Sequence, residues 1–114
     1  MSVDYHKKRF HAVQNEDGDV GAGTIFYYQQ DGNLVWAEYA GGEVVKGHLI
    51  ALADDSGCLD MRYQHLSKDG QLKTGVCSSR PEILPDGRLR VHERWRWTCG
   101  DGAEGESIIE EIKE

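Results

Sequence analysis

The sequence predicts an all-β fold: a single domain of eight antiparallel strands, joined as an up-and-down meander and closed into a small barrel. Glycine-containing turn motifs recur along the 114 residues, and the segments between them are roughly 8–12 residues long, as in short antiparallel strands. These segments are rich in Val, Ile, Tyr, Trp and Thr, and they show no helical period. The length fits one domain spanning residues 1–114.

Seven turn motifs define the predicted strands. Asp-Gly and Gly-Gly pairs favour tight hairpins, because such turns need positive φ angles. The motifs are NEDGD, QDGN, YAGGE, DDSG, KDGQ, LPDGR and CGDG. They separate strands predicted at residues 7–13, 22–30, 33–40, 43–53, 58–67, 71–80, 88–98 and 104–113. An open sheet of eight strands would expose two long edges, and closing the sheet removes them.

The predicted barrel resembles in architecture the lipocalin, fatty-acid-binding and avidin group of proteins. Eight strands close a barrel whose interior is either filled by side chains or wide enough for one small ligand. Because such a fold can serve many functions, the inward side chains must distinguish between these cases.

The composition argues against several classes of partner. A net charge of −7 opposes nonspecific binding to nucleic acid or to an anionic membrane, since both need a basic surface. The chain has no apolar run near the ~18 residues of a membrane-spanning helix, and its first residues, MSVDYHKKRF, lack the apolar core of a signal peptide. The three cysteines, Cys58, Cys77 and Cys99, do not form a CxxC motif, which fits free thiols. We therefore expect a soluble, cytoplasmic protein.

The sequence carries no familiar motif for a cofactor, a metal ion or a catalytic centre. It has no GxSxG elbow, HExxH helix, phosphate loop or dinucleotide fingerprint. The five histidines lack the close spacing of metal ligands. The sequence thus predicts no cofactor and no metal, and it favours a role without catalysis.

The segment LRVHERWRWTCG, residues 89–100, alternates between two kinds of side chain. One face carries Leu89, Val91, Trp95 and Trp97, and the other carries Arg90, His92, Arg94 and Arg96. Glu93 lies on the apolar face, so the pattern predicts a carboxylate among buried tryptophans. The outward basic residues favour ion pairs with neighbouring carboxylates such as Glu111, and an anion-binding strip is the alternative.

Extending this alternation from hairpin to hairpin predicts an interior with many polar groups. The candidate ligand-binding residues are Tyr28, Tyr39, His48, Tyr63, His65, Glu93, Trp95 and Trp97. Other residues predicted inside are Phe26, Lys46, Ile50, Met61, Val76, Ser78, Ile108 and Glu110. Polar groups that converge within an aromatic surround are typical of a ligand site.

The leading hypothesis is a barrel that holds a small polar or amphipathic ligand. The two tryptophans and Tyr63 would enclose it, while Glu93 and the two histidines would bind its polar end. The first alternative is a filled core, in which the same tyrosine, histidine and glutamate side chains satisfy only one another.

Two further hypotheses use other features of the chain. An outer apolar patch would join two copies as a homodimer. The residues of that predicted interface are Ile25, Leu34, Trp36 and Leu49. The other hypothesis is an enzyme in which Glu93 or His65 acts as a general acid or base. Glu93 would then lie opposite Glu110, so that like-charge repulsion raises the pKa of one carboxyl group.

Several short motifs follow one another along nearly the whole chain: FYYQQDG, YAGG, GHLI, MRYQH, SRPEILPDG, HERWRWT and GESIIEE. In these motifs, residues 5–113 resemble a family of small bacterial proteins often labelled N-acetylglutamate synthase. That label implies an acetyl-CoA-dependent α/β enzyme in which a helix N-terminus binds the pyrophosphate. The hairpin pattern predicts no such helix, so the sequence disagrees with the label.

Overall fold

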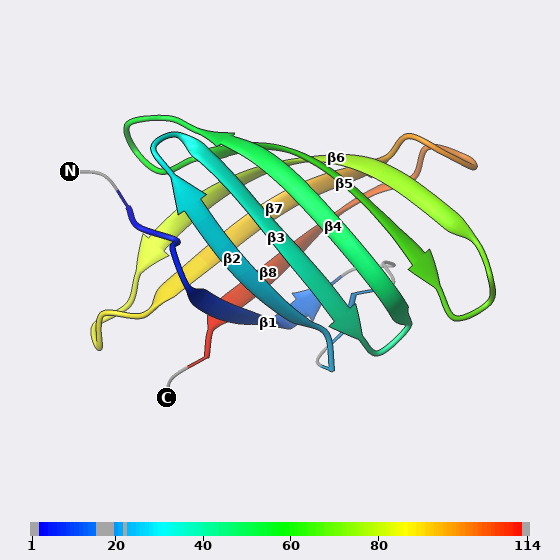
Figure 1. Cartoon of the computed structure of the whole chain (residues 1–114), viewed down its shortest axis with the longest axis horizontal. Helices are drawn as coiled ribbons and strands as arrows, with labels where there is room; N and C mark the ends of the chain where they lie inside the picture. Colours follow the sequence, from blue (N-terminus) through cyan, green and yellow to red (C-terminus); the bar gives the residue numbers. More distant parts are fainter. Residues whose placement is uncertain (1–2, 16–19, 22, 113–114) are drawn as a thin grey trace.

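The computed structural model describes residues 3–15, 20–21 and 23–112, which form a closed barrel of eight antiparallel strands (Figure 1). The strands are β1 (Lys8–Asn15), β2 (Ile25–Asp31), β3 (Leu34–Gly41), β4 (Val44–Ala53), β5 (Leu59–Ser67), β6 (Leu72–Ile83), β7 (Leu89–Trp97) and β8 (Glu104–Glu111). Each strand pairs with the next, and β8 pairs with β1 to close the sheet. The predicted all-β meander is therefore confirmed. The described residues include no helix long and apolar enough to cross a membrane.

The turns explain why the predicted strand boundaries lie within three residues of the observed ones. Gly42 and Gly87 have φ angles of 62° and 90°, a region that glycine adopts without the steric cost of a Cβ atom. The first predicted turn, NEDGD, lies almost entirely outside the described residues.

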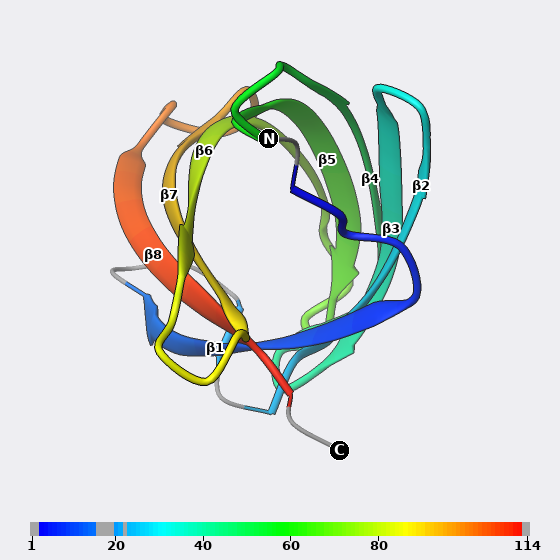
Figure 2. The same cartoon turned by 90° about the vertical axis from the view of Figure 1, so that its left-hand side faces the viewer.

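Tyr5, which precedes β1, closes one end of the barrel. This end also carries the β2–β3, β4–β5 and β6–β7 turns, and Figure 2 looks into it, with the N-terminal segment lying across part of the ring of strands. The Tyr5 side chain is 0% exposed, and its ring stacks on Tyr28 with centroids 5.7 Å apart. Its hydroxyl donates a hydrogen bond of 2.6 Å to the carbonyl oxygen of Gly57. A residue outside the sheet therefore fills this end.

The side chains of β2, β3, β5 and β7 have the predicted orientation. Phe26, Tyr39, Met61 and Trp95 are all buried inside the barrel. The alternation within each of these strands was therefore assigned to the correct face.

The side chains of β4 have the opposite orientation, so part of the predicted interior was wrong. Lys46, His48 and Ile50 are exposed on the outer face. Leu49, which was predicted outside, is buried in the core together with Ala51. His48 therefore does not face the interior, and Leu49 is not part of an outer interface.

A β-bulge next to the Gly41–Gly42 turn contributes to this reversal. Tyr39 pairs with Gly47, whereas Gly41 pairs with Val44, so one strand carries an extra residue. Such a shift moves the side chains beyond it to the opposite face of the sheet, because strand side chains alternate with a period of two.

The strands β6 and β8 also face the opposite way from the prediction. Val76, Ser78, Ile108 and Glu110 point outward, and their neighbours Cys77, Ser79, Ser107 and Ile109 are buried. The cause is a register displaced by an odd number of residues. Tyr63 pairs with Gly75 and not Val76, and Trp95 pairs with Gly105 and not Ile108.

Candidate functional site

A cavity of about 50 Å³ lies inside the barrel, toward the end opposite Tyr5. Residues of every strand except β1 line it, and Val20 is contributed by the segment between β1 and β2. The lining residues are Val20, Phe26, Tyr39, Leu49, Met61, Tyr63, His65, Cys77, Glu93, Trp95, Trp97 and Ser107. Six of the eight predicted ligand-binding residues are thus brought together here.

The cavity is small for a ligand site. Pockets for drug-sized ligands typically measure about 300–1,000 Å³, whereas a single water needs about 10–15 Å³. In the described conformation the cavity therefore has room for a few water molecules only. A larger ligand requires side chains at this end, such as the half-buried Val20 and Trp97, to move outward. The barrel interior is thus close to the filled-core alternative, with space left at one place.

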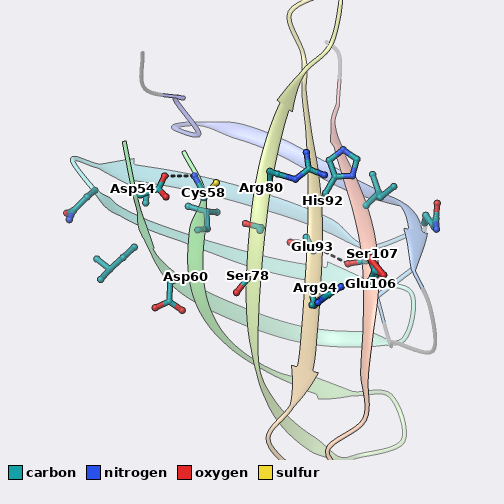
Figure 3. Close-up of a pocket in the computed structure, with 17 residues that line it drawn as sticks. Asp54, Cys58, Asp60, Ser78, Arg80, His92, Glu93, Arg94, Glu106 and Ser107 are labelled. Atoms are coloured by element: carbon teal, nitrogen blue, oxygen red, sulfur yellow. Dashed lines mark hydrogen bonds between the residues drawn. The ribbon is translucent and has the colours of Figure 1, made fainter. Parts of the chain in front are cut away.

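Glu93 of β7 is the carboxylate within this cavity. Its Oε1 atom accepts a hydrogen bond of 2.9 Å from the Ser107 hydroxyl, drawn as a dashed line in Figure 3. Burial raises the pKa of Glu93 from its ordinary value of 4.5 to about 7, and the hydrogen bond from Ser107 offsets part of that rise. Near neutral pH the group therefore exchanges between its neutral and its charged form.

The predicted pairing of Glu93 with Glu110 is wrong. Glu93 lies opposite Ser107 on β8 and opposite Ser79 on β6. Glu110 faces outward, and its carboxylate oxygen lies 2.7 Å from a guanidinium nitrogen of Arg90. The raised pKa of Glu93 therefore comes from burial, and not from repulsion between two carboxylates.

Aromatic rings form the wall of the cavity nearest its mouth. The Tyr39 hydroxyl and the Nδ1 atom of His65 are 2.9 Å apart, within hydrogen-bonding distance. The His65 and Tyr63 rings lie 5.6 Å and 5.7 Å from Trp97, each edge to face. Trp95 lies 5.6 Å from Trp97. Such contacts fix the rings relative to one another and leave polar tips within the cavity.

Two glycines inside strands leave room for these rings, and the sequence reasoning missed them. A Cβ atom on Gly47 would overlap the ring of Tyr39, and one on Gly75 would overlap the ring of Tyr63. A glycine within a strand often marks such a close approach, so this signal was present in the sequence.

Two buried hydroxyl groups near Glu93 have no hydrogen-bond partner among the described residues: Tyr28 Oη and Ser79 Oγ. Burial raises the pKa of Tyr28 well above its ordinary range, and the charge of the nearby Glu93 adds to this rise. Tyr28 was predicted as a site residue, whereas Ser79 and Ser107 were missed because β6 and β8 were given the wrong orientation. Buried polar groups are normally paired, so these two call for a partner.

A second hollow, of about 850 Å³, lies open to solvent and is lined mainly by β5 to β8, with a few residues from β1, β4 and the β2–β3 turn. Glu93 and Ser107 line it as well as the interior cavity. Figure 3 shows Arg80, His92 and Arg94 there, together with Asp60 and Glu106. Basic and acidic side chains are interspersed over this surface, so it does not present a charge of one sign. Nearby basic residues are also paired, as in the 2.8 Å contact between His92 and Glu82.

Comparison with known proteins gives one result for the chain. The family model described as "Avidin-like protein" matches residues 3–112, which include all eight strands. No curated protein and no solved structure gave a significant match.

Proposed function

We propose that this chain, which belongs to the avidin-like protein family, binds one small molecule inside its barrel. The apolar part of the ligand would lie against Trp95, Trp97 and Tyr63, and its polar end would lie at Glu93. One observation carries the proposal: hydrogen-bonding groups and aromatic rings converge on a single interior cavity. The acid–base chemistry considered for Glu93 and His65 stays a prediction.

The two ends of the barrel support entry from one side. Tyr5 fills one end with a fully buried ring that is hydrogen-bonded to Gly57. At the other end the cavity is bordered by Val20 and Trp97, which are only half-buried. The ligand would therefore enter between these two side chains, with Trp97 as the ring that it contacts first.

We expect the protein purified from its own host to release a small molecule on denaturation, as measured by comparing native and denatured masses. Replacing Trp97 with alanine should lower the bound fraction, corresponding to roughly tenfold weaker binding, because a stacked ring contributes about 0.5–1.5 kcal/mol beyond its buried area. Trp36→Ala is the matched control, since Trp36 lies on the outer face of β3. If the purified protein carried no small molecule, binding inside the barrel would be contradicted. The same holds if the bound fraction fell equally in Trp97→Ala and Trp36→Ala.

A second role is supported by apolar side chains on the outer face of β3 and β4. Leu34 pairs with Leu52, and Trp36 pairs with Ile50, so these four residues form one continuous outer patch. The side chains of Leu34, Ile50 and Leu52 are 37%, 51% and 57% exposed. Because a two-fold interface uses the same surface on both subunits, we propose that this outer patch joins two copies of the chain. Ile25 on β2 lies on the same face, at its edge.

Replacing Trp36 with glutamate should convert a dimer into a monomer in sedimentation experiments, since a carboxylate would be buried without a partner at the centre of the outer patch. Leu72→Glu is the control, because Leu72 is 80% exposed and lies on β6, away from that patch. A wild-type protein that sediments as a monomer, or an unchanged mass in Trp36→Glu, would count against the homodimer.

A further inference from the structure

We infer that the ligand is a small organic cation, a protonated amine whose charged group lies at Glu93 within the aromatic wall of the cavity. This inference rests on the proposed function and names the chemical class of its ligand. It follows from the charge and the rings that line the cavity, and from two buried hydroxyl groups near Glu93.

The charges that line the cavity are unbalanced. Glu93 is the one carboxylate among the described lining residues, and these include no lysine and no arginine. Ser107 gives Glu93 a hydrogen bond but no positive charge. An ionised carboxylate in apolar surroundings is costly unless it is paired with an opposite charge. A cationic ligand would supply that charge.

The aromatic rings favour the same kind of ligand. Phe26, Tyr39, Tyr63 and the two tryptophans line the cavity, and the faces of such rings attract cations. The ring of Trp97 already has a cation over it, since the ammonium nitrogen of Lys73 lies 5.3 Å from its centroid. Lys73 is on β6 and is not among the residues that line the cavity.

The hydroxyl groups without partners fit a ligand with several N–H donors. Ser79 lies directly opposite Glu93 on the neighbouring strand, and Tyr28 is close enough for its pKa to respond to the Glu93 charge. Their oxygen atoms and the carboxylate can all accept hydrogen bonds, and the two hydroxyl groups can also donate. A primary ammonium group has three donors, an alcohol has one and a carboxylate has none. Of these three groups, only the ammonium has one donor for each of the three acceptors.

The affinity for an amine should also depend on pH, because a cation binds the ionised form of Glu93. With its pKa raised to about 7, the ionised fraction rises roughly tenfold between pH 6 and pH 8, and so should the affinity. Burial raises the pKa values of Cys77, Tyr28 and Tyr5 around it, so these groups stay neutral in this range. His65 also faces the cavity, so the pH dependence is measured in His65→Gln as well, and its loss in that variant would contradict the assignment to Glu93.

The test compares butylamine, butanol and butyrate, which are matched in size, by titration of the tryptophan fluorescence of the wild-type protein at pH 7.5. We expect the amine to bind at least about tenfold more tightly than the alcohol, and butyrate to bind most weakly. Equal or tighter binding of butanol or butyrate would overturn the cationic ligand but support a ligand site. If none of the three binds, the cationic ligand is also overturned, and the native mass measurement decides the proposed function separately.

Two variants locate the effect at Glu93. Glu93→Gln keeps the shape of the side chain and should weaken butylamine binding about tenfold or more, while binding of butanol changes less than about twofold. Glu106→Gln removes a carboxylate from the exposed face of β8 and should leave both affinities unchanged. Thermal unfolding shows whether each variant is folded. Equal losses of amine and alcohol binding in Glu93→Gln would overturn the inference, and the wild-type comparison tests it without any variant.

Discussion

Replacing Tyr5 with alanine is expected to lower the free energy of unfolding by about 3–5 kcal/mol, the usual cost of deleting a fully buried aromatic side chain. The Tyr5 ring is 0% exposed and contacts two other aromatic rings, Tyr28 at 5.7 Å and Phe10 at 6.4 Å between centroids. Its loss would leave a cavity at the closed end of the barrel and remove the hydrogen bond to Gly57. Few single changes in this chain should be as costly.

Urea unfolding monitored by circular dichroism measures this effect. Tyr5→Phe keeps the ring and loses only the hydrogen bond, so its expected cost is about 1 kcal/mol. Tyr27→Ala removes a tyrosine that is 52% exposed on the outer face, and it should change the stability by less than about 0.5 kcal/mol. If Tyr5→Ala were no more costly than Tyr27→Ala, Tyr5 would not be a structural part of the closed end.

The importance of Tyr5 was not visible in the sequence. Strand periodicity identifies inward residues only within strands, and Tyr5 precedes β1. By contrast, the turn glycines identified every connection in the described part of the barrel, because a turn that needs positive φ selects glycine strongly. Local backbone chemistry therefore predicted the strands and their order, whereas a long-range contact such as that of Tyr5 with Gly57 left no local pattern.

The candidate site was predicted only in part, for a related reason. Glu93, Trp95 and Trp97 lie on one strand, so their shared face follows directly from alternation. The inward orientation of His48 was predicted by carrying the register from one strand to the next. A register displaced by one residue moves the side chain to the opposite face of the sheet. The same error hid Ser107, the hydrogen-bond partner of Glu93. Patterns within a strand were thus reliable here, whereas the face carried from strand to strand was right for β2, β3 and β5 and wrong for β4, β6 and β8.

Glu93 should make the stability of the barrel depend on pH. The folded-state pKa of about 7 is above the ordinary value of 4.5, so the folded protein holds this proton more tightly than the unfolded chain does. Below pH 4.5 the carboxyl group is neutral in both states and has no effect. As the pH rises from 4.5 through 7, the unfolded state is favoured progressively, since only there is the charge fully hydrated. The total loss corresponds to about 3 kcal/mol.

We therefore expect Glu93→Gln to be more stable than the wild type by about 3 kcal/mol at pH 8 and equally stable at pH 4.5, as measured by urea unfolding at both values. Comparing the two proteins at each pH cancels the contributions of the other carboxylates that they share. Glu106→Gln is the matched control, and its difference from the wild type should stay within about 0.5 kcal/mol at both values, because Glu106 is exposed.

The direction of this result bears on the role of Glu93. A carboxylate that served only the core would be stabilised by its surroundings, and its replacement would lower the stability at neutral pH. A gain in stability in Glu93→Gln at pH 8 would show that the barrel retains a charge that weakens its own fold. Such a loss of stability is expected where a charged group serves binding, because a bound cationic ligand would neutralise the charge and restore the stability. A loss of stability at pH 8 would instead assign Glu93 to a structural network with Ser107.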